Sequence, residues 1–182
     1  MSSEPRVVFA AGFDSLFSKE VRARVTPALE AELLALGVNL KKPFNPAYPV
    51  EAWAGSVKAC AKHLFPDAKG NEGFFELGRL TMRGFRETLI GAAIFGVMRL
   101  IGPARTLERS ARTYASASNY TQVSLKRLSE SSYEMGLNEA HTPPEYDMGV
   151  IDQAIELLGV KPSVKLLNAS SEGFLMLVSW EK

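Results

Sequence analysis

The sequence predicts an α+β fold, with N-terminal helices followed by a strand pair, a helix and a second strand pair in an antiparallel sheet. Apolar residues recur at steps of three and four through most of the first 115 positions. From about Tyr120 the step changes to two, which is typical of half-buried strands. Helical spacing then returns once before the C-terminal alternation. This order of elements indicates α+β rather than an alternating parallel fold.

Composition is that of an ordinary globular protein, with 182 residues, 46% of them hydrophobic and 23% charged. We expect a single domain over residues 1–182, because this length supports one core and is short for two. The formal net charge of +1 gives no field that would recruit nucleic acid, so no nucleic-acid partner is expected. The single cysteine, Cys60, excludes an internal disulfide and suits the predicted cytoplasmic location.

The N-terminal part opens with RVVFAAGF (6–13), whose valines and phenylalanines predict a short strand or extended arm. Thr26 and Pro27 are typical of a helix start, and Gly37 is typical of a helix stop. Three prolines within 41–49 predict an extended loop. The expected helices cover about 14–24, 26–37, 50–65, 72–102 and 104–115.

The helix expected over 72–102 is rich in glycine, and Gly102-Pro103 is expected to end it. Each internal glycine costs about 1 kcal/mol relative to alanine, so the helix should lie against another backbone or form a cavity wall. Its arginines occur at steps of three and four and are expected to form a solvated face. The glycines are 73, 78, 84, 91 and 96, and the arginines are Arg79, Arg83 and Arg86.

The apolar run 89–101 is shorter than the roughly 20 apolar residues that a bilayer span needs, and it contains Arg99. No membrane span is therefore expected. The strand region after Tyr120 is interrupted by the proline-containing loop 141–146, which excludes a central strand. The expected strands lie near 123–125, 133–138, 164–168 and 174–180, and the intervening helix lies within 145–158.

Candidate catalytic and metal-binding residues do not form a recognisable constellation. His63 and Cys60 are three positions apart, but metal sites normally need three or four ligands and no further cluster completes this pair. His141 lies in the proline-rich loop, where a solvated histidine is the simpler interpretation. No phosphate-binding motif is found. We therefore expect no catalytic residue, no metal site and no cofactor.

Two features favour a ligand or a partner. Four phenylalanines and five glycines within 73–96 predict either ordinary core or an apolar cleft for a hydrophobic ligand. The Ser- and Thr-rich run 113–122 is either a hydrogen-bonding rim or a simple connection from helix to strand. A homodimer is also expected, with an interface that includes part of 85–98 and in particular Gly91. The candidate ligand-binding residues are Phe74, Phe85, Leu89, Phe95 and Cys60.

Over nearly its whole length the chain resembles a myxobacteria-restricted family of roughly 180-residue domains with no assigned function. Patterns of glycine, proline and aromatic residues carry the resemblance, and none of them is a catalytic signature. They are YPVEAW with HLFP, ELGRLTMRGFRETLIG, LIGPAR and the ending PPEYDMGVIDQAIELLGV…VSW.

A second, architectural resemblance rests on LGRLTMRGF, the strands, EYDMGVIDQAIELLG and the terminal hairpin. These are similar to the fold of TRAPP subunits, 4-vinyl-reductase domains and haem nitric-oxide-binding domains. In those proteins a glycine opens the helix between the two strand pairs, and Gly149 matches it. The resemblance implies that Gly149 lets the first helical turn approach a neighbour and that Gly159 caps the helix C-terminus.

The chain departs from these relatives where they bind ligands. Haem-binding members carry a Y-x-S-x-R motif and a proximal histidine, whereas residues 114–118 read YASAS and end in Ser118. The cysteine-rich tail of the reductase domains is absent, and Cys60 does not fall on the acylated cysteine of TRAPP subunits. The resemblance implies a non-enzymatic sensory or regulatory domain that binds a small apolar ligand or a protein partner. The alternatives are a dimeric interaction scaffold without a ligand and, third, an enzyme with an unrecognised site.

Overall fold

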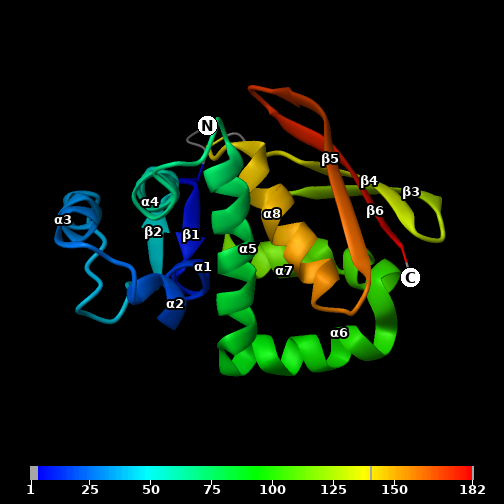
Figure 1. The fold of residues 1–182 in the computed structure, drawn as a ribbon, viewed down its shortest axis with the longest axis horizontal. Coiled ribbons are helices and arrows are strands. Elements are labelled where there is room, and N and C mark those ends of the chain that lie inside the picture. Colours follow the sequence, from blue (N-terminus) through cyan, green and yellow to red (C-terminus); the bar gives the residue numbers. More distant parts are fainter. Residues whose placement is uncertain (1–3, 140, 182) are drawn as a thin grey trace.

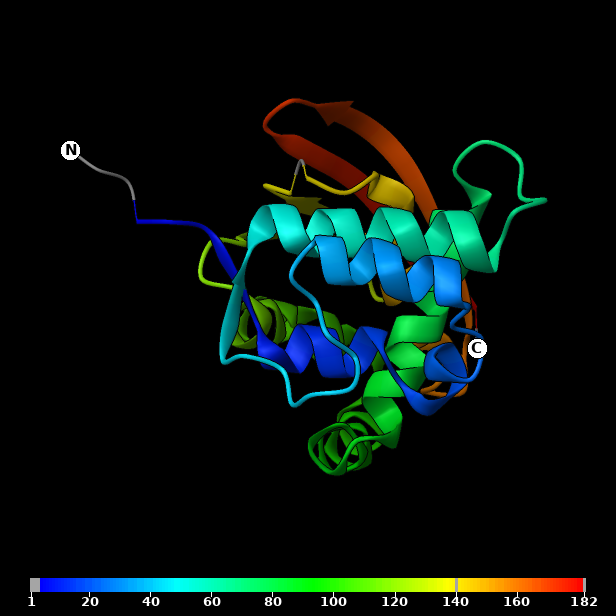
Figure 2. The same ribbon diagram turned by 90° about the vertical axis from the view of Figure 1, so that its left-hand side faces the viewer.

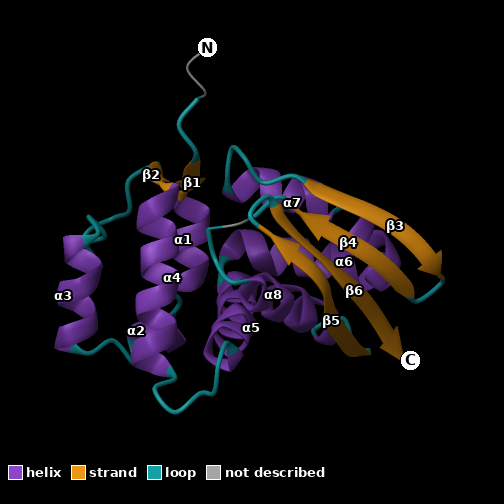
Figure 3. Cartoon of the chain, turned by 90° about the horizontal axis from the view of Figure 1, so that it is seen from above, coloured by secondary structure: helices purple, strands orange, loops and turns teal. Residues whose placement is uncertain are grey.

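The computed structural model describes residues 4–139 and 141–181, and it confirms the α+β class (Figure 1). Helices form the N-terminal half, and a four-stranded antiparallel sheet with one helix packed on it forms the C-terminal half. Seen from above, the helices lie together on one side of the sheet (Figure 3).

The first half combines a two-stranded antiparallel sheet with short helices. Thr26 caps α3 as predicted, because its hydroxyl accepts a hydrogen bond from the Leu29 N–H at 3.2 Å. The helix expected over 14–24 is wrong in its start and its continuity: the chain is helical from Ala10 and breaks at Ser18. The elements are β1 (Val7–Phe9), α1 (Ala10–Leu16), α2 (Lys19–Arg22), α3 (Pro27–Ala35), β2 (Ala47–Pro49) and α4 (Val50–Leu64).

The glycine-rich segment is two helices and not the one that periodicity predicted. α5 (Glu72–Glu87) and α6 (Leu89–Glu108) meet at a bend of about 100°. Thr88 makes this corner: its backbone is extended, and its hydroxyl accepts a hydrogen bond from the Gly91 N–H at 2.9 Å. The side chain of Thr88 thus satisfies a free N–H at the start of α6 and fixes the direction of the new helix.

Gly102 kinks α6 but does not end it. Its φ of 78° is a conformation that favours glycine, and the chain resumes helical geometry from Pro103 to Glu108. α7 (Ser110–Ala117) follows at once. The predicted helix stop is therefore an internal break, because proline at a first helical position starts a new turn as readily as it ends an old one.

The antiparallel sheet has the strand order β3-β4-β6-β5, and its strands extend the predicted ones. Alternate residues of β4 and β6 are buried on the face that α8 covers, which explains the two-residue spacing of the sequence. The elements are β3 (Val123–Ser129), β4 (Ser132–Leu137), α8 (Pro144–Glu156), β5 (Lys161–Ser170) and β6 (Gly173–Glu181).

Two apolar clusters make up the core. The first joins α1, α3, α4 and α5, and the second joins α8 to the inner face of the sheet. α5 and α8 pack directly against each other between these clusters (Figure 1). A Cβ on Gly78 of α5 would collide with the Tyr146 carbonyl of α8, and one on Gly149 would collide with the Phe75 carbonyl of α5. Gly149 is therefore a contact position, as the architectural resemblance implied.

The arginines of α5 do not all form the solvated face that their spacing predicted. Arg79 forms ion pairs with Asp152 and Glu156 of α8, and its side chain is only 21% exposed. Arg83 donates to Gln153 of α8 at 2.9 Å. α8 therefore covers Arg79 and Arg83, whereas Arg86 is exposed as expected.

No single helix within the described residues is long and apolar enough to cross a bilayer. Residues of α5 and α6 reach that composition only as a pair, across the sharp bend between them.

Candidate functional site

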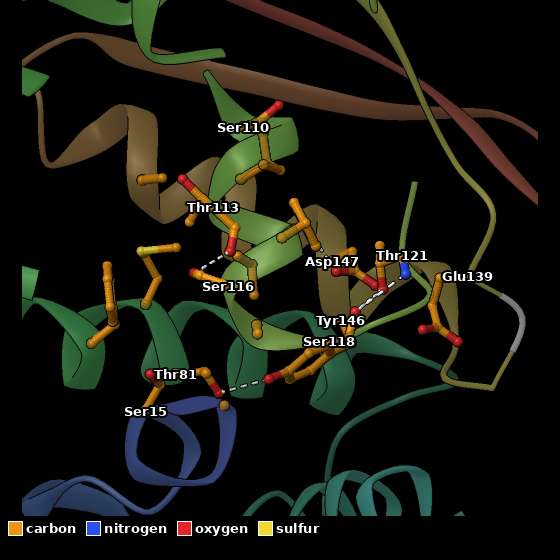
Figure 4. A pocket seen from close by; sticks show the side chains of 18 of the residues that line it. Ser15, Thr81, Ser110, Thr113, Ser116, Ser118, Thr121, Glu139, Tyr146 and Asp147 are labelled. Carbon is orange, nitrogen blue, oxygen red and sulfur yellow. Dashed lines mark hydrogen bonds between the residues drawn. The ribbon is translucent and has the colours of Figure 1, made fainter. Parts of the chain in front are cut away.

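A cavity of about 170 Å³ lies where α1, α5, α7 and α8 meet, next to the loops that flank α7 and α8 (Figure 4). It occupies the junction between the two apolar clusters. α1 contributes small residues to its wall, including Ala11 and Gly12. The close approach of α5 and α8 at their two glycines brings the other walls to it.

Most of the cavity wall is apolar. Met82 and Phe85 of α5 contribute one side, and Met98 of α6 reaches it from beyond the bend. Val150, Ile151 and Ala154 of α8 form part of the opposite side. Such walls favour an apolar ligand surface.

Asp147 is the first of two buried acidic side chains at the polar end of the cavity. It is 5% exposed, and its Oδ1 accepts a hydrogen bond from the Tyr114 hydroxyl of α7 at 2.9 Å. Burial raises the pKa of Asp147 to about 7, and the neighbouring Glu139 carboxylate adds to the rise. A considerable fraction of Asp147 is therefore protonated at neutral pH, and its proton is sensitive to any charge that enters the cavity.

Glu139 is the second acid, and it is 6% exposed. Its Oε2 accepts a hydrogen bond from the Tyr120 hydroxyl at 2.6 Å, and its Oε1 accepts one from the His141 N–H at 2.5 Å. Burial raises the pKa of Tyr120, and Glu139 raises it further, so this phenol remains a hydrogen-bond donor. Arg6 lies over the Tyr120 ring at 5.7 Å and contacts His141, but it does not pair with either acid.

Further polar side chains lie on the floor and rim of the cavity (Figure 4). The Tyr146 hydroxyl donates to Thr81 Oγ1 at 3.2 Å and links α8 to α5. The Ser118 hydroxyl donates to Thr121 Oγ1 at 2.7 Å, just beyond α7. Ser110 also lines the cavity, and its buried Oγ has no hydrogen-bond partner among the described residues. The run 113–122 thus contributes a hydrogen-bonding rim, one of the two interpretations its composition allowed.

The five residues predicted to bind a ligand do not converge on this cavity. Phe85 lines it, and Phe95 packs against Phe85 with ring centroids 6.3 Å apart. Phe74 packs against the first apolar cluster, and Leu89 is 90% exposed on α6. Cys60 is buried in the first cluster, away from the cavity wall. The ligand contact proposed for these five residues stays a prediction, and the cavity supports it for Phe85.

Burial raises the pKa of the Cys60 thiol to about 12, and Glu32 adds to the rise. The thiol is therefore protonated and a weak nucleophile, so acylation at this position has little chemical support. His63 is directed to Glu32, with Nε2 and Oε2 2.9 Å apart, and does not complete a Cys–His pair. Within the described residues no group of three or more His, Cys, Asp or Glu side chains is placed to hold a metal ion.

Sequence patterns missed the acids and tyrosines at the polar end. One signal was present: Asp147 precedes Ile151 by four positions and Ala154 by seven, so a carboxyl group shares the apolar face of α8. A carboxyl group on such a face is buried or lines a cavity. Glu139 gave no such signal, because it follows β4 in a loop and only the tertiary structure turns it inward.

Solved structures that are similar to this fold include H-NOX domains. An unliganded Fe(II) H-NOX protein from K. algicida has 8% identity and a TM-score of 0.68, with 96% of this chain and 97% of that chain covered. An oxygen-binding H-NOX domain related to soluble guanylate cyclases has 12% identity and a TM-score of 0.70, with 94% and 92% covered. A mutant form of the T. Tengcongensis H-NOX has 12% identity and a TM-score of 0.67, with 94% and 96% covered. At these identities the likeness shows an H-NOX-like fold and nothing further.

By sequence, the chain belongs to the family described as "Protein of unknown function (DUF2378)", which matches residues 6–181. A search of curated proteins finds no match to the sequence. The predicted membership of a family without an assigned function is thus confirmed, and so is the predicted likeness in fold to haem nitric-oxide-binding domains. The restriction to myxobacteria and the likeness to TRAPP subunits and 4-vinyl-reductase domains stay predictions.

Proposed function

We propose that this protein is a non-enzymatic sensory or regulatory domain that holds a small, largely apolar molecule in the cavity between α1, α5, α7 and α8. The observation that carries the proposal is the cavity itself, which has an apolar wall and buried hydrogen-bonding groups at one end. Its position is suited to signalling, because a ligand there touches both apolar clusters at once. Occupancy would therefore change how α5 and α8 pack, and ligand binding would in this way change the conformation of the protein.

Haem is the group that the fold suggests, since solved H-NOX structures are described as Fe(II) and haem proteins. The residues present here do not fit it. At about 170 Å³ the cavity is large enough for a compact molecule, since apolar cavities of roughly 150 Å³ bind benzene, but it is far too small for a porphyrin. Neither histidine lines it: His63 pairs with Glu32, and His141 lies against Arg6 and Tyr120. We therefore propose a ligand other than haem.

The YASAS segment supports the same conclusion. Tyr114 lies in helix α7, and its hydroxyl is engaged by Asp147. Ser118, at the position where the haem-binding motif has arginine, is bonded to Thr121 at the rim of the cavity. Neither residue supplies a cation for the carboxylate groups of a haem.

Binding without catalysis is supported by how the polar groups of the cavity are engaged. The three tyrosine hydroxyls donate to Asp147, Glu139 and Thr81, so each is committed to a structural hydrogen bond. Burial and the neighbouring carboxyl groups raise the pKa of Tyr114 and Tyr120, so neither phenol supplies the phenolate that nucleophilic catalysis would require.

A second candidate function is a dimeric interaction scaffold without a ligand, and a different observation favours it. The outward side of α6 is apolar, with Leu89 90% exposed, Leu100 88% exposed and Val97 49% exposed. This helix runs along one margin of the molecule (Figures 1 and 2). A second copy of the chain that covers this side would remove it from water.

Native mass spectrometry of protein purified from its own host tests the proposed function. We expect a bound small molecule on the wild-type chain and its loss in Ala117→Leu, which fills part of the cavity wall. Ala111→Leu, at an exposed position of the same helix α7, is the matched control and should retain the molecule. Wild-type protein that carries no adduct, or an adduct that Ala117→Leu retains in full, would refute the cavity as a ligand site and favour the scaffold.

A further inference from the structure

The polar end of the cavity contains two buried carboxyl groups without a matching positive group. Asp147 and Glu139 are each more than nine-tenths buried, and both line the cavity. Within the described part of the chain, no lysine, arginine or histidine lies within ion-pair distance of either carboxyl group. Buried carboxyl groups of this kind are normally paired with a cation or a metal, because an unpaired buried charge is costly.

The hydrogen bonds at the polar end show which carboxyl oxygen can still accept a hydrogen bond from a ligand. Glu139 uses both carboxyl oxygens, one for the Tyr120 hydroxyl and one for the His141 N–H. Asp147 uses Oδ1 for the Tyr114 hydroxyl, and the described residues provide no partner for Oδ2. A carboxylate has about four acceptor positions, so Asp147 is the group with acceptor capacity left for a ligand.

Aromatic rings surround the same end. Tyr114, Tyr120 and Tyr146 all line the cavity, and burial raises the pKa of each phenol, so all three stay neutral. Neutral phenol rings present negative faces that attract a cation. Arg6 already uses this attraction on Tyr120, with its guanidinium carbon 5.7 Å from the ring centroid.

The geometry points to a small organic cation as the ligand class: a protonated amine on a compact apolar body. The ammonium group would donate to the free oxygen of Asp147 beside Glu139 and the tyrosine rings, and the apolar body would lie against Phe85, Met82 and Ile151. Anionic molecules such as fatty acids or phosphates would meet two carboxyl groups and be repelled. This inference rests on the proposed function, because it names the chemical class that the cavity would take.

Three probes of similar shape test which ligand charge the cavity accepts. They are cyclohexylamine, which is a cation at neutral pH, cyclohexanol, which is neutral, and cyclohexanecarboxylate, which is an anion. Isothermal titration of the full chain should show the amine binding about tenfold tighter than the alcohol, the size expected for hydrogen bonds to a charged group. The carboxylate should not bind detectably. In Asp147→Asn the amine should lose this advantage, so that the ratio of its affinity to that of cyclohexanol falls to about one.

Asp67→Asn, in an exposed loop, is the matched control and should bind all three probes like the wild type. Glu139→Gln provides a second test if Asp147→Asn does not fold, and it should weaken only the amine. Equal binding of amine and alcohol, or an anionic adduct from the host, would refute the cationic class while the ligand cavity stands. No binding of any probe, together with no adduct from the host, would refute the proposed function as well.

Discussion

Gly78 of α5 and Gly149 of α8 each lie against the backbone of the other helix. A Cβ on Gly78 would come within 2.9 Å of the Val150 N–H nitrogen, and one on Gly149 would come within 2.9 Å of the Phe75 carbonyl carbon. Both distances are shorter than real Cβ contacts allow. The two helices that join the apolar clusters therefore approach to a separation that only glycine permits, and the cavity beside them depends on this approach.

Replacing Gly149 with leucine should destabilise the fold through overpacking at this contact. We expect the free energy of unfolding to fall by about 1–3 kcal/mol. Urea denaturation measures the change. Gly96→Ala is the matched control: a methyl group on Gly96 of helix α6 would meet nothing within 4 Å, so this variant should gain roughly 0.5–1 kcal/mol. Unchanged stability of Gly149→Leu would contradict the close helix contact.

Removal of the Arg79 side chain should cost more than removal of a surface arginine. Asp152 is 7% exposed, and Arg79→Ala leaves its carboxylate without the cation that it contacts on α5. We expect a loss of about 1–3 kcal/mol, below the value for fully buried pairs because Arg79 and Glu156 are partly exposed. Arg24→Ala, which breaks the exposed pair with Glu20, should cost no more than about 0.5 kcal/mol. An equal decrease in the free energy of unfolding for both variants, measured by chemical denaturation, would mean that the α5–α8 ion pairs stabilise the fold no more than an exposed pair does.

The stability of the protein should depend on the ionisation of Asp147. Burial and the nearby Glu139 raise its pKa from 3.8 to about 7. Above pH about 4 the unfolded chain loses this proton while the folded chain keeps it, so this contribution to stability declines as pH rises to about 7. The decline is at most about 4 kcal/mol, from roughly 1.4 kcal/mol for each pKa unit.

Asp147→Asn cannot ionise and should flatten this decline. Urea denaturation at a series of pH values between about 4 and about 8 measures the free energy of unfolding of wild type and variant. The wild-type value, relative to that of the variant, should fall as pH rises. A relative value that instead increases with pH, or one that does not change with pH, would contradict the raised pKa.

The purified protein should be colourless and should not retain added haem. Neither histidine lines the cavity, and Ser118 stands where haem-binding relatives have arginine. Incubation with haemin followed by desalting should leave no Soret band in the absorption spectrum. A band that survives desalting and disappears in Ala117→Leu would show that the cavity opens to take the macrocycle.

We expect a homodimer that buries the outward side of α6. The sequence suggested Gly91 as the position to test, but a Cβ there would strike the Phe85 carbonyl at the α5–α6 corner, so Gly91→Arg would disturb the fold itself. Leu100→Glu is the better variant, because Leu100 is 88% exposed and its replacement removes little packing in the monomer. Leu34→Glu on α3, where leucine is 56% exposed, is the control.

Sedimentation equilibrium measures the assembly. Wild type and Leu34→Glu should have twice the 19.9 kDa mass of one chain, and Leu100→Glu should have the mass of one chain. A wild-type mass near 19.9 kDa at concentrations well above micromolar would rule out the dimer.

The sequence by itself determined the α+β class and the succession from N-terminal helices to a strand pair, a helix and a second strand pair. These features follow from local spacing and from the conformational range of single residues, so they are readable along the chain. Thr26 and Pro27 marked the start of α3 for the same reason. The sequence also indicated that no complete catalytic motif is present, which stays a prediction.

Only the tertiary structure decided where the glycine-rich segment bends and which residues meet at the cavity. Thr88 turns the chain by about 100° through one hydroxyl and one backbone conformation, which apolar spacing does not record. Arg79 is less exposed than its spacing predicted, because it pairs with Asp152 on the helix that covers it, 73 positions further along the chain. Asp147 and Glu139 lie on either side of a proline-containing loop, and their burial at one end of a cavity depends on the packing of α5 against α8. Contacts between distant segments set the electrostatics of the site, and no local pattern encodes them.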